Sequence, residues 1–135
     1  MKRGIDEGFA PEELIEHAVG ELKAVPEVQA VYLFGSHARG EAGPLSDIDI
    51  CVVAPKDVER EKKLDMMGPC SDVLNVSIFW DLPPQIRMRV AHEGVCLFER
   101  DKAAALAAML DSIKEYLDFR PVFMRFALRS LGAKW

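Results

Sequence analysis

Apolar residues recur along the chain with two spacings, and together these spacings predict alternating helices and strands. Spacings of three and four residues predict helices, whereas short apolar runs bounded by turn residues predict strands. Strands are expected over residues 28–34, 47–53, 72–80 and 95–98. Helices are expected over residues 11–25, 56–67, 83–94 and 101–117, with a last one, interrupted early by Pro121, running to Leu131. This pattern predicts an α/β (α+β) fold, a mixed sheet of about four strands flanked by helices.

The length of 135 residues, half of them apolar, predicts one domain over residues 1–135 with one main core. Helices over residues 101–131 are expected to pack on this domain or to form an interface. The apolar stripe of the first of them consists of Leu106, Met109, Leu110, Ile113 and Leu117. The last helix has more apolar groups than a small domain needs, at Phe119, Val122, Phe123, Phe126 and Leu131.

Charge, cysteine content and the lack of long apolar runs indicate which partners and which cellular compartment to expect. The net charge of −5 makes nucleic acid an unlikely partner, because proteins that bind phosphate backbones present a basic surface. The three cysteines, Cys51, Cys70 and Cys96, show no metal-binding spacing, and their odd number argues against a disulfide framework. The chain has no apolar run of membrane-spanning length, and its first residues lack a signal-peptide core. We therefore expect a cytoplasmic protein without a membrane partner.

The chemistry is concentrated around the ends of the first two predicted strands. Gly35 ends the first strand, where glycine lets the backbone approach a ligand closely. Ser36 adds a hydroxyl and is expected to start a short helix whose N–H groups attract phosphate oxygens, and Arg39 adds a cation within one turn. Asp47 and Asp49 lie two residues apart on the second strand, which places both carboxylates on one face. Such a pair is typical of magnesium binding together with substrate phosphates.

Each of these features is common on its own. A Gly-Ser turn occurs in many loops, and an Asp-x-Asp pair can be a solvated strand edge. Their combination is more specific, because two acids inside an apolar strand are costly unless a cation joins them. The combination therefore predicts a site for a magnesium–nucleoside triphosphate.

The sequence Gly35-Ser36, ten residues, then Asp47-x-Asp49 resembles the signature of the DNA polymerase beta nucleotidyltransferases. Later segments, residues 81–87, 93–101 and 115–121, resemble the MntA-type minimal nucleotidyltransferases. Proteins of that group are antitoxin partners of HepT-type HEPN ribonuclease toxins. The similarity extends over nearly the whole chain from about residue 10.

The resemblance implies an activity, a cofactor and a partner. Gly35 and Ser36 would hold the triphosphate of ATP, and Asp47 and Asp49 would bind Mg²⁺, with two ions expected. The implied reaction moves AMP from ATP to a hydroxyl, in this subgroup a tyrosine of the partner toxin, which is thereby silenced. The implied partner is a HepT-like HEPN toxin, with a homodimer as a further option.

One position departs from the family pattern. The usual third carboxylate, near the start of the next strand, corresponds to Asn75, counted back from Pro83-Pro84. Alternation supports this register, because Leu74, Val76 and Ile78 form an apolar face and leave Asn75 on the other. Asparagine offers a neutral oxygen to a metal ion but cannot accept a proton as a general base. Asp72 is the alternative carboxylate, although it falls in the register of the apolar face.

Three functions remain open at this point. The first is a protein adenylyltransferase with Asp47, Asp49 and Asn75 as the catalytic set. The second is a nucleotide-binding antitoxin that acts by occlusion, which Asn75 favours. The third is a nucleotidyltransferase for RNA or a small molecule, which the acidic charge and the lack of an acceptor domain disfavour.

Overall fold

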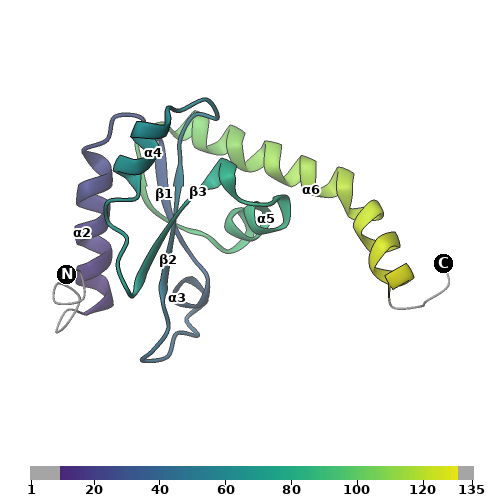
Figure 1. Ribbon diagram of the computed structural model, residues 1–135, viewed down its shortest axis with the longest axis horizontal. Helices are drawn as coiled ribbons and strands as arrows, with labels where there is room; N and C mark the ends of the chain where they lie inside the picture. The colour runs from purple at the N-terminus through teal and green to yellow at the C-terminus, as the bar shows by residue number, and fades with distance from the viewer. Residues whose placement is uncertain (1–9, 131–135) are drawn as a thin grey trace.

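The computed structural model describes residues 10–130 and shows a four-stranded mixed sheet with helices on both faces, as expected (Figure 1). The strands are β1 (Ala30–Phe34), β2 (Ile48–Val53), β3 (Leu74–Ile78) and β4 (Val95–Glu99). The helices are α2 (Pro11–Lys23), α3 (Ser36–Arg39), α4 (Arg60–Met66), α5 (Pro84–Glu93) and α6 (Lys102–Ser130), with a 3₁₀ turn, η1, over Phe79–Asp81. No helix in residues 10–130 is long and apolar enough to cross a membrane.

The order of the strands brings three chain segments to one end of the sheet. The order is β3-β2-β1-β4, with β1 antiparallel to β2 and β4, and β2 parallel to β3. The end of β1 therefore lies beside the beginnings of β2 and β3. In this register Phe34 pairs with Asp49, and Asp49 pairs with Asn75.

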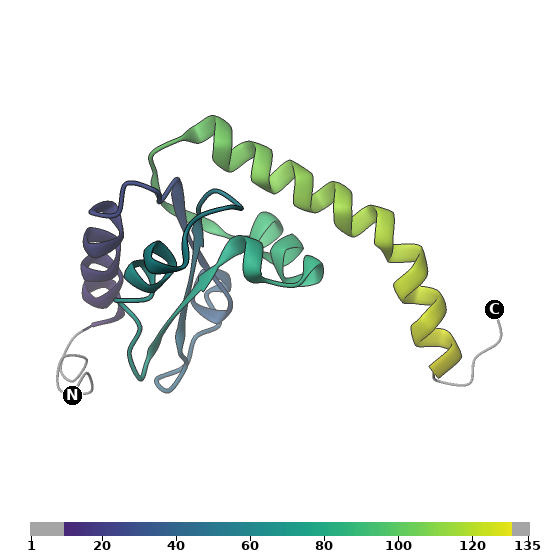
Figure 2. The same cartoon turned by 45° about the horizontal axis from the view of Figure 1, so that its top comes forward.

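One face of the sheet is covered by α2 and α4, which lie together on one side in both views (Figures 1 and 2). Alternate residues of the strands point into this core, as period-two patterning requires. Its buried strand residues are Val31, Leu33, Ile48, Ile50, Val52, Leu74, Val76 and Ile78. The predicted apolar faces of the second and third strands are thus confirmed.

The opposite face is covered over only part of its area. A second cluster packs α5 and α6 on it, through Val90, Ala105 and Ala108 against Ala30, Cys51 and Val53. Asp49, Asn75 and Ser77 lie on this same face, by their alternation with the buried residues of β2 and β3. Asn75 is exposed and Asp49 is half-buried. The polar residues therefore occupy the part of the face that α5 and α6 leave uncovered.

The last helix differs from its prediction. In place of two helices separated before Pro121, α6 is one helix that includes Pro121, and Leu131 lies outside the described residues. The helix changes direction along its C-terminal part and extends away from the sheet (Figures 1 and 2), as expected where proline removes an i to i−4 hydrogen bond. Small residues, Ala105, Ala108 and Ser112, form its buried face.

One further expectation needs correction. The third strand ends at Ile78, because the chain turns into η1 and buries Phe79 completely in the second cluster. Arg87 of α5 is buried and donates to Glu115 at 2.7 Å and to the carbonyl of Leu82 at 2.8 Å. This ion pair fastens α5 to α6. Cys51 is buried, and Cys96 is exposed on the edge strand β4.

Candidate active site

The backbone at Gly35 is shaped for a residue without a side chain. Gly35 directly follows β1 with a φ of 78°, in the region that favours glycine. A Cβ atom at this position would lie 2.6 Å from Oδ2 of Asp49. The carboxylate of Asp49 therefore occupies the space beside the Gly35 backbone, which brings one member of the predicted acid pair into contact with the predicted ligand loop.

Asn75 lies directly beside Asp49 on the neighbouring strand. Its Nδ2 donates to Oδ1 of Asp49 at 3.4 Å, and the two residues are Cα partners in the parallel ladder. The register predicted from Pro83-Pro84 thus places Asn75 next to the acid pair. Asp72, the alternative carboxylate, is exposed and precedes β3 by two residues, outside the ladder.

The acid pair fits a divalent metal ion bound together with phosphate oxygens. Asp47 is exposed, one residue before β2, and Asp49 is the second residue of the strand, with buried Ile48 between them. Among residues 10–130, no group of three or more His, Cys, Asp or Glu side chains is placed to hold a metal ion. Magnesium is commonly bound through one or two carboxylates and completes its shell with substrate phosphates and water. Asp47 and Asp49 are carboxylates of the kind that this donor set requires.

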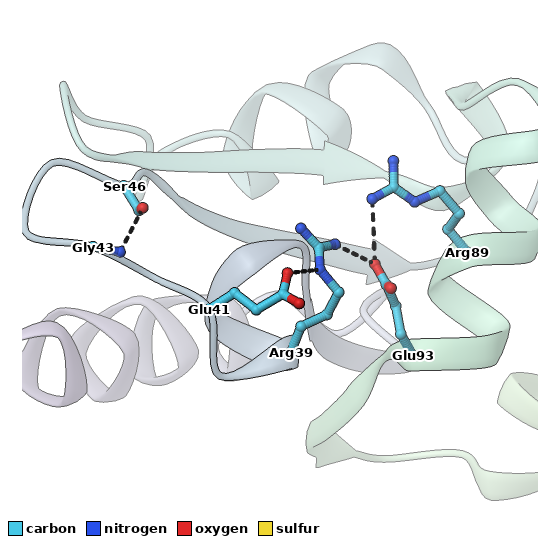
Figure 3. A network of polar contacts seen from close by, with 6 residues as sticks. All are labelled: Arg39, Glu41, Gly43, Ser46, Arg89 and Glu93. Atoms are coloured by element: carbon cyan, nitrogen blue, oxygen red, sulfur yellow. Dashed lines mark hydrogen bonds and ion pairs between the residues drawn. The ribbon is translucent and has the colours of Figure 1, made fainter.

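The loop between α3 and β2 is fixed by short-range hydrogen bonds. Nε2 of His37 lies 3.3 Å from the carbonyl oxygen of Ser46. The hydroxyl of Ser46 accepts from the N–H of Gly43 at 2.9 Å (Figure 3). Ser36 is the first residue of α3 and is half-buried beside Gly35. His37 thus has a structural contact that connects α3 to the residue preceding Asp47.

Arg39 takes part in a network of ion pairs. Its Nε donates to Glu41 at 2.8 Å, and its NH1 donates to Glu93 at 3.1 Å (Figure 3). The hydrogen bond with Glu41, supported by Glu93, raises the pKa of Arg39, which secures its positive charge. Glu93 also pairs with Arg89 at 3.6 Å, so both arginines converge on one carboxylate at the end of α5.

Sequence reasoning identified Arg39 but missed Glu93 and Arg89. Their spacing of four residues on a helix indicates a mutual ion pair. The approach of Glu93 to Arg39 joins residues 54 apart in the sequence, however, and depends on how α5 packs on the sheet. Arg39, the cation predicted to bind phosphate, therefore forms ion pairs with two carboxylates, Glu41 and Glu93, in this structure.

Replacing Gly35 by alanine should disturb both the fold and the site. We expect the free energy of unfolding to fall by about 1–3 kcal/mol from backbone strain. We expect nucleotidyl transfer to fall by about 10²-fold, because the new Cβ displaces Asp49. Gly40→Ala is the matched control, since Gly40 also has a positive φ, of 72°, but no atom lies within 4 Å of its added Cβ. Equal losses of activity in the two variants, measured beside urea unfolding, would contradict the role of Gly35.

The comparisons with known proteins agree with this geometry. Residues 16–103, about two thirds of the chain, match the model of the family described as Polymerase beta, Nucleotidyltransferase. The chain belongs to the polymerase beta nucleotidyltransferase family. The matched range contains Gly35, Ser36, Asp47, Asp49 and Asn75.

Solved structures with a similar fold include chains from toxin–antitoxin complexes. A chain in a toxin–antitoxin crystal structure with AMP-PNP superimposes with a TM-score of 0.71 and 18% identity, over 90% of this chain and 99% of that one. A chain in the structure of a tri-AMPylated Shewanella oneidensis HEPN toxin with an MNT antitoxin superimposes with a TM-score of 0.69 and 15% identity, over 89% and 98%. These likenesses confirm the fold.

In sequence, the chain is 33% identical over 72 residues to MJ1547 of Methanocaldococcus jannaschii, which is named as a candidate protein adenylyltransferase. The match covers 53% of this chain and 57% of that relative. The chain therefore spans little more than half of the length of this relative.

Proposed function

We propose that this nucleotidyltransferase moves AMP from Mg-ATP to a tyrosine hydroxyl of a HepT-like HEPN toxin and thereby silences it. The observation that carries the proposal is the contact of three strand ends, in which Asp49 lies against Gly35 and beside Asn75. Asp49 and Asn75 lie on the part of the sheet that α5 and α6 leave uncovered, which supports access for a nucleotide and a second protein. The toxin–antitoxin neighbours and the relative MJ1547 support AMP as the group and a protein as the acceptor.

Each site residue has a role in this proposal. The Gly35 backbone and the Ser36 hydroxyl contact the triphosphate, and Arg39 adds positive charge to the phosphates. Asp47 and Asp49 would hold Mg²⁺, with two ions proposed, which when bound stabilise the attacking and leaving oxygens. To reach the phosphates, Arg39 exchanges at least one of its carboxylate partners, Glu41 or Glu93, for phosphate oxygen.

The proposed reaction is an in-line displacement at the α-phosphorus. The tyrosine oxygen forms a bond to the α-phosphorus, and the bond from that phosphorus to the bridging oxygen breaks. Pyrophosphate leaves with the electron pair, and the phenolic proton passes to solvent water. Asn75 cannot take this proton, since its amide has no basic site at neutral pH. The reaction therefore proceeds without carboxylate assistance at this position.

The experiment is transfer of label from ATP to a HepT-like HEPN toxin, with the product of the reading frame adjacent to that of this chain as the first candidate. The purified chain, the toxin and Mg²⁺ are incubated with ATP labelled on the α-phosphate, and in parallel with ATP labelled on the γ-phosphate. Transfer of AMP predicts label on the toxin only from the α-phosphate, lost when the acceptor tyrosine is replaced by phenylalanine. Label from the γ-phosphate would indicate a kinase and would contradict the proposal.

The second candidate is a nucleotide-binding antitoxin that occludes its partner, and Asn75 is the observation that favours it. On that reading the chain binds ATP and inhibits the toxin ribonuclease, but no covalent label appears. Inhibition that vanishes when the two proteins are separated by denaturing and refolding the toxin indicates occlusion. Inhibition that persists on the refolded toxin indicates covalent AMP.

A further inference from the structure

One face of α6 presents large apolar side chains to solvent. Leu106, Leu110 and Leu117 are 56%, 56% and 52% exposed, and Ile113 is half-buried between them. We call these four residues the outer seam. Their spacings are four, three and four residues, the repeat by which helices pair in coiled coils. The seam thus has the pattern of a helix-pairing surface.

The outer seam is not the face with which α6 packs on its own domain. That contact uses Ala105, Ala108 and Ser112, which are buried, and the ion pair from Glu115 to Arg87. At 100° per residue these positions point away from the seam, on the other side of the helix. The sequence therefore places small residues where α6 meets the domain and larger apolar residues where it meets solvent. The domain already has its core without the seam.

The charge at the next position of the repeat indicates what covers the seam. Leu106 and Ile113 occupy the same position of a seven-residue repeat, and the next residue at that position is Arg120, which is exposed. No ion pair among the described residues includes Arg120. A parallel second copy would place Arg120 against Arg120. An antiparallel copy centred on Ile113 would place Arg120 within about one turn of Lys102, so like charges oppose self-pairing in both directions.

We propose that the outer seam docks an amphipathic helix of a different protein, which presents apolar residues to Leu106–Leu117 and a carboxylate to Arg120. The seam extends for about 17 Å, at 1.5 Å per residue, which is enough for three turns of a partner helix. Pairing across it buries the exposed leucines, and an acidic partner residue neutralises Arg120. Only the identity of the partner as the toxin rests on the proposed function.

The test is the affinity of the full chain for the toxin of the label-transfer experiment, measured by calorimetry. Leu110→Lys and Leu117→Lys should each weaken binding at least ~10-fold, because each places a charge inside the apolar contact. Leu64→Lys is the matched control, since Leu64 is 62% exposed on α4 and away from the seam. It should change the affinity less than ~2-fold.

A second pair of variants tests the charge. Arg120→Glu should weaken binding at least ~10-fold, whereas Arg125→Glu, an exposed arginine of the same helix that lies off the repeat, should change it less than ~2-fold. Unchanged far-ultraviolet circular dichroism and ATP affinity show that each variant is folded. If the Arg120→Glu variant binds the toxin as tightly as the wild type or more tightly, the claim that an acidic partner residue faces Arg120 is overturned. A wild-type dimer that Leu110→Lys dissociates, seen by light scattering, overturns the proposal in favour of a second copy.

The outcomes separate this inference from the proposed function. Transfer of AMP to the toxin, with binding that the seam variants leave unchanged, overturns the inference and leaves the enzyme standing. Loss of binding in the seam variants, with no transfer by the wild-type chain, supports the inference and rejects the adenylyltransferase.

Discussion

Replacing Asp49 by asparagine is expected to lower AMP transfer at least ~10³-fold. Asp49 is the central residue of the site, because its two carboxylate oxygens lie against Gly35 and Asn75. Since Asn75 is already neutral, the substitution leaves Asp47 as the one carboxylate of the catalytic set. Losing the charge that holds the metal ions removes several kcal/mol of transition-state stabilisation, and about 1.36 kcal/mol corresponds to tenfold in rate.

The nucleotide affinity of the same variant gives an independent measurement. Calorimetry with ATP should show a magnesium-dependent part of the affinity in the wild-type chain and its loss in Asp49→Asn. The triphosphate carries about four negative charges, which cannot lie beside two carboxylates without cations. Because asparagine has nearly the same shape as aspartate, the melting temperature should stay within a few degrees of the wild type.

Asp72→Asn is the control for Asp49→Asn. It removes the same charge from an exposed residue two positions before β3, outside the contact with Gly35. Transfer and magnesium-dependent binding should remain within about twofold of the wild type. If Asp72→Asn were the more damaging of the two, Asp72 would be the metal-binding carboxylate, and the assigned catalytic set would be wrong.

The sheet and its register could be predicted because period-two burial is a local signal. Ile48 and Ile50 had to point into the core, and this alone placed Asp47 and Asp49 on the other face. The same reasoning on Leu74, Val76 and Ile78 placed Asn75 beside them, which the Asp49–Asn75 pairing agrees with. A signature of glycine and paired acids added the family, which the family match confirmed.

The remaining features depend on contacts between distant segments. The burial of Arg87 depends on Glu115, 28 residues away, and Arg39 forms an ion pair with Glu93 of α5. The stripe of α6 shows the same limit, because apolar periodicity identifies a face but does not say what the face contacts. Small residues on the opposite side of α6, Ala105, Ala108 and Ser112, pack on the domain, which leaves Leu106 and Leu110 in solvent. The helix also continues past Pro121, which the local rule for proline does not predict.

Replacing Asn75 by aspartate should accelerate AMP transfer at least ~10-fold, because it supplies the base that the wild-type site lacks. A tyrosine hydroxyl has an ordinary pKa of ~10, so at neutral pH the attacking oxygen is almost always protonated. A carboxylate at position 75 would accept the proton as the bond to phosphorus forms, and general-base assistance is typically worth ~10²–10⁴-fold. We expect part of that range, because the added charge lies beside Asp49, which Asn75 contacts at 3.4 Å in the wild type.

The repulsion between Asp49 and the carboxylate introduced by Asn75→Asp gives the prediction a second signature. Two adjacent carboxylates repel unless a cation lies between them, so the variant should be less stable than the wild type without Mg²⁺ and should regain stability when Mg²⁺ and ATP are added. Thermal unfolding with and without Mg²⁺ measures this difference, and single-turnover transfer of label measures the rate. Asn75→Ala is the control for the amide itself, and it should not accelerate transfer. An Asn75→Asp variant that binds Mg-ATP more tightly yet transfers AMP no faster would show that proton removal does not limit the reaction, and that position 75 acts in metal binding alone.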